Sequence, residues 1–502
     1  MEAFLEVNSA SAADATKVCD LRSALEFLKQ FPGEYIETDK PVDPLAELAG
    51  VYRHVGSSGT IMRPSKIGPA MVFNKVKGSD DVRIVIGVLG SRKRVARLLN
   101  TTPEKLGFLV KDAAATPVPP VVIPTQKRAA CQEVVHLASD PGFDILKILP
   151  APSSTKSDAG PYFTMGLTYA ADPENGQRDL TIHRLCVQSK DEISIFLHGH
   201  IDEFRMKAEK AGKPLPVSIS IGVDPAIYIS TCFEAPTTPL GYDELSIAGS
   251  IRKRPVELVD CVAVKGLAIA NAEVVIEGEI LPNVRVREDQ NTKTGKAMPE
   301  FPGYSGGAAP SIPVIKAKAI THRKHPILQT CIGPSEEHCS MQGIPVEASI
   351  LTMADRAMPG FVQNVHCPTP GNGKLLAVIQ VKKTAPVHEG RQRQAALLAF
   401  STYSSLKHVF LVDEDVDIFD LNDVMWAMTT RYQGDTSTVC IPGVRCHMAD
   451  PSSDPTFDSS IREHGITCKT IFDCTVPWAL KDRFIRAQFL EVDPEPFLNP
   501  PK

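Results

Sequence analysis

The sequence predicts an α/β (α+β) fold in three parts: an N-terminal α/β domain over residues 1–124, a β-rich domain over 125–322 and a C-terminal α/β domain over 323–502. A chain of 502 residues is too long for a single hydrophobic core. The segment TPVPPVVIP at 116–124 contains four prolines in nine residues, which excludes a helix interior and marks a domain boundary. After it the pattern changes to short, β-branched runs.

The first domain alternates helices with strands. Asp20 is a suitable N-cap for a first helix, and Asp43 is expected to open a second helix in the same way. The apolar runs at 70–76 and 83–90 predict buried strands, and Ser91 can cap a basic helix that follows.

The second domain contains five short runs separated by Gly, Pro or Asn: YFTMGLTYA, DLTIHRLCV, VSISIGV, VELVDCVAV and AEVVIEGEI. They predict an antiparallel barrel or sandwich. In the third domain a strand at 374–383, a helix and a second strand, HVFLVDEDVD, indicate a parallel crossover. Asn422 is expected to cap the helix after it.

Composition narrows the functional classes. The net charge is -5 and there is no Lys/Arg-rich run, so the expected partner is a small molecule and not nucleic acid. No run of about 18 apolar residues predicts a membrane helix, and the N-terminus lacks the layout of a signal peptide. The twelve cysteines form no C-x-x-C pair, which favours reduced thiols and a cytoplasmic location.

The segment 179–200, DLTIHRLCVQSKDEISIFLHGH, carries the most unusual pattern. Alternation along a strand places Arg184 on the same face as Leu180 and Ile182. A buried guanidinium requires an acidic partner or an anionic ligand. Alternatively, Arg184 lies at the rim and reaches water.

Asp179, His200 and Glu244 lie on three predicted segments and form a candidate metal site, in which His198 competes with His200. Carboxylates with one imidazole suit Mn²⁺ or Mg²⁺ more than zinc, although such residues are also common at strand ends. Other histidines are interpreted as surface or structural residues: His322, His325, His338 and His366.

Glu300 lies between Pro299 and Phe301 in AMPEFPGYSGG, a partly apolar setting that suits proton donation; a solvated loop carboxylate is the alternative. The run VRVREDQ at 284–290 is interpreted as an exposed, ion-paired turn. Gly303–Gly307 matches the G-x-S-x-G pattern of serine hydrolases, but its proline-rich flanks do not support a strand-to-helix elbow. We expect a loop that lets backbone approach a ligand.

Together these motifs resemble, in order and over nearly the whole chain, the UbiD family of decarboxylases, which use prenylated FMN. The segments that carry the resemblance are DLTIHRLCV, the histidine of HGHIDEF, the glutamate of GYDELSIAGS, VVIEGEILPNVRVRED, AMPEFPGYSGG and DEDVDIFDLNDVMWAMTTR. Within the family, TIHRLCVQ, CFEAPTT and CKTIFDCTVPWALK look most like the protocatechuate (3,4-dihydroxybenzoate) decarboxylase branch.

The resemblance implies a central split β-barrel that binds the flavin and a C-terminal domain that builds a homodimer or homohexamer. Asp179, His200 and Glu244 match positions that hold Mn²⁺ against the cofactor phosphate, although many members have Asn in place of Asp179. The remaining cofactor positions are Ile182, His183 and Arg184 beside the flavin and Ser230, Thr231 and Cys232 in a segment of backbone contacts that includes a K⁺ site.

Arg184 and Glu300 match two members of the family's Glu-Arg-Glu network. Arg184 would hold the substrate carboxylate or its acidic neighbour, and Glu300 would deliver a proton to the ring carbon that CO₂ leaves. The second glutamate usually lies five residues before the first, where this chain has Gly295, so Glu288 is the nearest replacement, with Asp289 behind it.

The expected function is therefore reversible, non-oxidative decarboxylation of a hydroxylated benzoic acid, with protocatechuate giving catechol and CO₂. Gallate, 4-hydroxybenzoate and vanillate are alternative substrates. A flavin prenyltransferase would supply the cofactor. Two rival functions are a non-catalytic flavin-binding or maturation subunit and the serine hydrolase of the G-x-S-x-G match.

Overall fold

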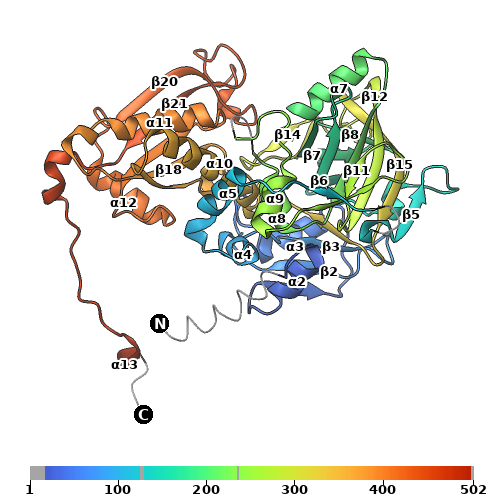
Figure 1. Cartoon of the computed structure of the whole chain (residues 1–502), viewed down its shortest axis with the longest axis horizontal. Coiled ribbons are helices and arrows are strands. Elements are labelled where there is room, and N and C mark those ends of the chain that lie inside the picture. Colours follow the sequence, from blue (N-terminus) through green and yellow to red (C-terminus); the bar gives the residue numbers. More distant parts are fainter. Residues whose placement is uncertain (1–16, 125–128, 234–236, 499–502) are drawn as a thin grey trace.

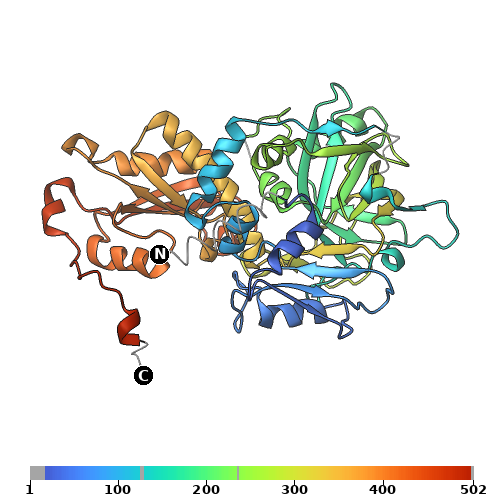
Figure 2. The same ribbon diagram turned by 60° about the horizontal axis from the view of Figure 1, so that its bottom comes forward.

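The computed structural model describes residues 17–124, 129–233 and 237–498 (Figure 1). The predicted N-terminal features before residue 17 therefore lie outside the described residues. An N-terminal sheet lies beside a large β-barrel, and the C-terminal domain lies on the other side of the long helix α10, which spans Glu336–Ala357 (Figures 1 and 2).

The N-terminal sheet has the strand order β1-β2-β3-β16. Its strands are β1 (Tyr35–Thr38), β2 (Ala70–Phe73), β3 (Arg83–Ile86) and β16 (Ile327–Thr330). The last strand pairs in parallel with β3, so a segment that the sequence assigns to the third domain completes the sheet of the first. The helices are α2 (Leu21–Leu28), α3 (Glu47–Val55), α4 (Arg92–Leu98) and α5 (Leu106–Ala115).

Two of the expected helix caps in this domain are confirmed and one is wrong. The side chain of Asp20 accepts a hydrogen bond from the Ser23 backbone, and Ser91 caps α4. Asp43 does not cap α3, because the helix begins later and Asp43 accepts a hydrogen bond from the Leu45 backbone N–H within a turn.

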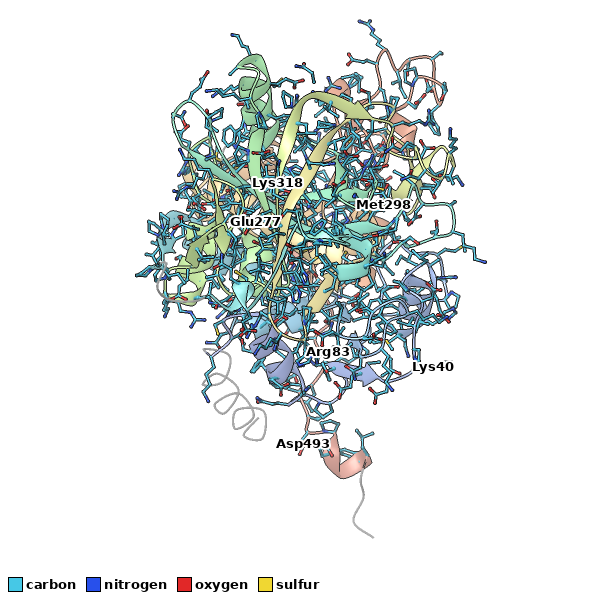
Figure 3. The ribbon with its side chains drawn as sticks, turned by 90° about the vertical axis from the view of Figure 1, so that its right-hand side faces the viewer. Lys40, Arg83, Glu277, Met298, Lys318 and Asp493 are labelled. Carbon is cyan, nitrogen blue, oxygen red and sulfur yellow. The ribbon has the colours of Figure 1, made fainter. Side chains whose placement is uncertain are left out.

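The central strands form a closed barrel and not a sandwich. Its strands are β6 (Tyr162–Ala171), β7 (Arg178–Val187), β8 (Glu192–Ile195), β9 (Leu215–Ile221), β12 (Val274–Val286) and β15 (Ile312–His322). They follow the order β12-β9-β6-β7-β8-β15, and the antiparallel pairing of β12 with β15 closes the ring. Figure 3 shows Glu277 of β12 and Lys318 of β15 on this barrel, with Arg83 of the N-terminal sheet below it. The short strand β5 (Val134–Leu137) extends the sheet beyond β15.

Alternation along the barrel strands separates two hydrophobic clusters. Phe163, Leu185 and Ile219 belong to one cluster, whereas Leu167 and Leu180 belong to another. The second cluster also contains residues of α8 (Pro225–Ser230) and α9 (Leu245–Arg252) and of the separate three-stranded sheet. That sheet consists of β4 (Val121–Val122), β10 (Glu257–Asp260) and β11 (Leu267–Ile269), so part of the proline-rich segment pairs as a strand.

The C-terminal domain is a five-stranded sheet of order β17-β18-β19-β21-β20. Its strands are β17 (Val362–His366), β18 (Leu376–Val381), β19 (His408–Asp413), β20 (Thr438–Arg445) and β21 (Ile466–Asp473). Helix α11 (Arg391–Thr402) connects the parallel pair β18 and β19, which confirms the expected crossover. Helix α12 (Leu421–Arg431) is capped by Asp420 and not by Asn422, because the Asp420 side chain accepts the Asn422 backbone N–H.

The remaining elements are short. They are α6 (Ile145–Ile148), α7 (His200–Lys210), β13 (Lys296–Pro299), β14 (Ser305–Gly307) and α13 (Glu495–Leu498), the last at the end of a segment that leaves the body and carries Asp493 (Figures 1 and 3). Among the helices of the described ranges, none has the length and apolar character needed to cross a membrane.

We expect Glu273→Gln to lower the free energy of unfolding by about 2–3 kcal/mol, because a buried carboxylate that joins three elements loses its charge. Glu273 accepts hydrogen bonds from Arg22 at 2.7 and 2.9 Å and from the Ile327 backbone at 3.0 Å. Urea titration would measure the change. As a control, Glu279→Gln removes only the half-exposed pair with Lys318, and its cost should stay under about 1 kcal/mol. Equal costs for the two variants would contradict the prediction.

Candidate active site

Arg184 lies on β7 between two glutamates. Its Nη1 donates to Glu300 Oε1 at 2.5 Å and its Nη2 donates to Glu288 Oε2 at 2.8 Å. The guanidinium also lies over the ring of Phe196, 4.2 Å from its centroid. The Arg184 side chain is 16% exposed. The alternative of a rim arginine that reaches water is therefore wrong, because the carboxylates hold it inside the protein.

Glu288 follows β12 directly and is enclosed by hydrogen-bond donors. Its side chain is 1% exposed and accepts from the Tyr162 hydroxyl at 3.0 Å and from the Ala309 backbone at 2.9 Å, in addition to Arg184. The neighbouring Asp289 is also buried and accepts from Arg287 Nε at 2.5 Å. The expectation of an exposed ion-paired turn is therefore wrong for both acidic residues, although the Arg287–Asp289 pair is present.

Glu300 lies at the turn of the hairpin formed by β13 and β14. Its backbone N–H donates to the Tyr304 carbonyl at 2.7 Å, and its side chain is 24% exposed. A Cβ on Gly306 would come within 2.9 Å of the Glu300 Cγ, so the glycine is needed for this approach. Ser305 lies in β14, and the next element is the strand β15. The strand-to-helix elbow of a serine hydrolase is thus not formed here.

The three candidate metal ligands lie close together. Asp179 Oδ1 is 3.0 Å from His200 Nδ1, and Glu244 accepts a hydrogen bond from the Leu180 backbone, next to Asp179. Burial, and then the charge of Asp179, raise the pKa of Glu244 well above its ordinary value. As placed, no group of three His, Cys, Asp or Glu side chains among the described residues forms a metal centre. Two buried carboxylates beside one imidazole nevertheless fit a hard divalent cation, which would neutralise them.

The candidate cofactor residues come from β7 and from the end of α8. Ile182 packs against the cluster that contains Cys232. Ser230 and Thr231 are buried, and their hydroxyls donate to the Ala226 and Tyr228 carbonyls. Their hydroxyl oxygens can still accept a hydrogen bond from a ligand or bind a cation.

Arg184 Nε is a buried donor with no hydrogen-bond partner among the described residues. It offers a hydrogen bond to an anion placed against the site. Ile182, two residues before Arg184 on β7, and Cys232 at the end of α8 both border one hydrophobic cluster.

His183 is buried on the other side of the strand. Its ring meets that of His198 edge to face, with 5.4 Å between centroids, and neither ring nitrogen makes a hydrogen bond within the described structure. Burial, assisted by His198, lowers the pKa of His183 to about 3, so the imidazole is neutral at pH 7. His183 is therefore a neutral, buried side chain, and its role beside the flavin stays a prediction.

Three further polar residues surround Phe301, next to Glu300, and sequence reasoning missed them. The Phe301 ring lies 4.7 Å from the ring of His447, 6.1 Å from that of His338 and 4.8 Å from Lys374 Nζ. Burial and the Lys374 charge lower the pKa of His338 to about 3 and that of His447 to about 2. His338 was expected to be a surface or structural residue. No local pattern joins these residues, because they lie on separate elements.

The Phe301 backbone is held from two other parts of the chain. Its carbonyl accepts from Thr60 Oγ1 at 2.6 Å and from Asn372 Nδ2 at 3.1 Å. The loop that carries Glu300 is thus fixed by the N-terminal region, the barrel and the C-terminal domain together.

Three family models match consecutive parts of the chain. They describe the N-terminal, Rift-related and C-terminal domains of UbiD, 3-octaprenyl-4-hydroxybenzoate carboxy-lyase, and match residues 26–112, 123–336 and 339–474.

Individual relatives cover nearly the full chain. The apo structure of 3,4-dihydroxybenzoic acid decarboxylase from Enterobacter cloacae is 61% identical, with a TM-score of 0.92, and the match covers 96% of this chain and 99% of that one. Gallate decarboxylase of Lactiplantibacillus plantarum is 50% identical over 94% of this chain and 97% of its own length. The UbiD-class enzyme HmfF from Pelotomaculum thermopropionicum, solved in complex with FMN, is 34% identical, with a TM-score of 0.82 and coverage of 94% and 97%.

We expect His183 to weaken the fold in acid. Because its pKa falls from 6.5 in the unfolded chain to about 3 in the folded one, the folded state loses stability as pH falls between these values. Substitution of His183 by Leu should reduce the slope of the unfolding free energy against pH by about 1.4 kcal/mol per pH unit in this range. Urea titrations at several pH values would measure it. The exposed His54→Gln serves as a control, and the same slope in His183→Leu as in wild type would refute the assignment.

Proposed function

The chain belongs to the UbiD family of carboxy-lyases, and on that premise we propose that it decarboxylates protocatechuate to catechol and CO₂ with prenylated FMN as its cofactor. The observation that carries the proposal is the buried Arg184 held between Glu288 and Glu300. Such a reaction is reversible, so high bicarbonate should drive carboxylation of the ring.

The reaction needs a place for the electron pair that remains on the ring carbon when CO₂ leaves. Prenylated FMN, when bound, supplies an electron sink for that pair. Arg184 binds and orients the substrate, because its Nε has no partner in the described part of the chain while both Nη atoms contact glutamates. A charged hydrogen bond from this donor to the substrate carboxylate would place the carboxylated carbon beside Glu300.

Glu300 provides the proton. Its side chain is more exposed to solvent than that of Glu288 and accepts from Arg184 through Oε1. In its acid form it delivers a proton to the ring carbon that CO₂ leaves, and Arg184 then stabilises the carboxylate that results. Glu288, which is enclosed by donors, keeps Arg184 in place throughout.

The residues around Phe301 support a phenolic substrate. In neutral His338, Nδ1 donates to the Gly333 carbonyl and Nε2 can accept a hydrogen bond from a ring hydroxyl. In neutral His447, Nδ1 accepts from the Ala449 backbone and Nε2 can donate to a ring oxygen. The Lys374 ammonium can stabilise a deprotonated para-hydroxyl. A phenolate in the para position pushes electrons toward the carboxylated carbon. This set of groups favours an acid with adjacent hydroxyls.

The three candidate metal ligands and the residues at the end of α8 would complete the cofactor site. Asp179, His200 and Glu244 would hold Mn²⁺ against the cofactor phosphate, since a dianion beside two carboxylates requires a cation between them. The backbone of Ser230, Thr231 and Cys232 would contact the cofactor and K⁺. Asp179 makes this site more negative than the Asn of many relatives.

Membership of the family supports a proposal for the oligomeric state and for the source of the cofactor. We infer a cytoplasmic homodimer or homohexamer built by the C-terminal domain, and a flavin prenyltransferase as the source of the cofactor. The homologue HmfF has been solved as an evolved dimeric form with prFMN.

A related phenolic acid is the alternative substrate. Gallate is favoured over 4-hydroxybenzoate and vanillate by the 50% identity to a gallate decarboxylase. A non-catalytic flavin-binding or maturation subunit is disfavoured, because binding a cofactor phosphate requires neither Arg184 nor Glu300.

The proposal predicts that the protein releases CO₂ only when it is produced together with a flavin prenyltransferase, and from protocatechuate faster than from gallate, 4-hydroxybenzoate or vanillate. Headspace CO₂ and product chromatography would measure the rates. Bound cofactor, seen in the absorbance and mass spectra, without CO₂ from any of the acids would favour the carrier function instead.

Glu300→Gln should retain the cofactor but lower kcat by about 10²–10⁴, because the amide has no proton to deliver to the ring carbon. Stopped-flow or steady-state CO₂ release, with cofactor absorbance as the occupancy check, would measure this. Glu279→Gln, a glutamate of β12 paired with Lys318, is the matched control and should keep wild-type turnover. Full activity in Glu300→Gln would remove Glu300 from the proposed role.

A further inference from the structure

Tyr162 contacts Glu288, one of the two glutamates that hold Arg184. It is the first residue of β6, its side chain is fully buried, and its hydroxyl donates to Glu288 Oε1 at 3.0 Å. Strand pairing places Tyr162 opposite Cys186, two residues beyond Arg184 on β7. Strands β6 and β7 therefore each supply one hydrogen-bond donor to Glu288: the Tyr162 hydroxyl and the Arg184 guanidinium.

The two carboxylate oxygens of Glu288 have different partners. Oε1 accepts from Tyr162, whereas Oε2 accepts from Arg184 Nη2 at 2.8 Å and from the Ala309 backbone at 2.9 Å. The Glu288 main chain is held as well, because its N–H donates to the Ala309 carbonyl and its carbonyl accepts from Gln188 Nε2. Because the Tyr162 hydroxyl binds one carboxylate oxygen and Arg184 binds the other, the two contacts together fix the rotation of the Glu288 carboxylate.

We propose that Tyr162 is a positioning residue of the active site: its hydroxyl fixes the Glu288 carboxylate, and Glu288 in turn orients Arg184 toward Glu300 and the substrate. This inference rests on the proposed decarboxylase function. The chemistry of the side chain suits the role, because burial and the charge of Glu288 hold the pKa of Tyr162 far above its ordinary value and keep the hydroxyl protonated as a donor.

Loss of the hydroxyl would leave Oε1 of a buried carboxylate without a partner. The Glu288 carboxylate would then rotate, or its Oε1 would take a hydrogen bond from Arg184 that now goes to Glu300. Either change would lengthen the Arg184–Glu300 contact. Because a hydrogen bond to a carboxylate favours its charged form, loss of the Tyr162 hydroxyl makes Glu288 harder to ionise. The pH at which the site becomes active should therefore rise.

Tyr162→Phe tests the role with a change of one oxygen atom. We expect kcat to fall by about tenfold, the loss of one hydrogen bond to a charged group, with a much smaller change in KM. The acidic limb of the pH-rate profile should move to higher pH, and the cofactor absorbance should be unchanged. The control is Tyr52→Phe, an equally buried tyrosine whose hydroxyl donates to the Pro69 carbonyl; it should lose stability but keep the wild-type pH profile.

A double-mutant cycle supplies a readout that does not depend on activity. Urea unfolding of Tyr162→Phe, Glu288→Gln and the double variant should show coupling of about tenfold in the unfolding equilibrium constant. Additive effects, or a Tyr162→Phe pH-rate profile that overlays the wild-type profile, would overturn the inference. A wild-type protein that releases CO₂ from no acid would refute the proposed function itself, even if the coupling between Tyr162 and Glu288 is present.

Discussion

The need to pair a buried guanidinium is the constraint on which the site depends. Arg184 lies on a barrel strand whose other residues pack into the protein, so its charge cannot remain inside without carboxylates. Two glutamates meet it from different segments, Glu288 after β12 and Glu300 on the β13–β14 hairpin. With two carboxylates and one guanidinium, the set can hold a transferable proton while Arg184 stays charged.

Helix α10 connects the N-terminal domain to the residues around Phe301. Glu337, near its start, accepts from the Gly87 and Leu89 backbone at 2.7 and 3.0 Å, and Glu347 pairs with Arg92 at 2.7 Å. These contacts fix the helix against the N-terminal domain, while Asn372 and Lys374, which follow it in the chain, contact Phe301. The surroundings of Phe301 and Glu300 are therefore built by three domains, and their shape depends on how these domains pack.

Charge is divided between two neighbouring regions of β7. At its start, the charge of Asp179 adds to burial in raising the pKa of Glu244; toward its end, Arg184 contacts two glutamates whose charge it neutralises. The proposed metal and cofactor phosphate would thus lie at one end of the strand and the proposed acidic substrate at the other. The neutral histidines beside Lys374 add donors and acceptors for ring hydroxyls without adding charge.

The sequence by itself determined the order of an α/β, a β-rich and an α/β domain, the caps at Asp20 and Ser91, the parallel crossover of β18 and β19, and that Arg184, if buried, needs acidic partners. Each of these depends on side chains a few positions apart or on the cost of burying one charge. Only the tertiary structure decided that β12 closes on β15, that β16 joins the N-terminal sheet, and that Glu288 is buried against Arg184 and not exposed in a turn. Glu288 and Glu300 lie 104 and 116 positions from Arg184, and His338, Lys374 and His447 reach Phe301 from separate elements. Burial and charge pairing over such separations depend on how the domains pack, and no local pattern of residue types records that packing.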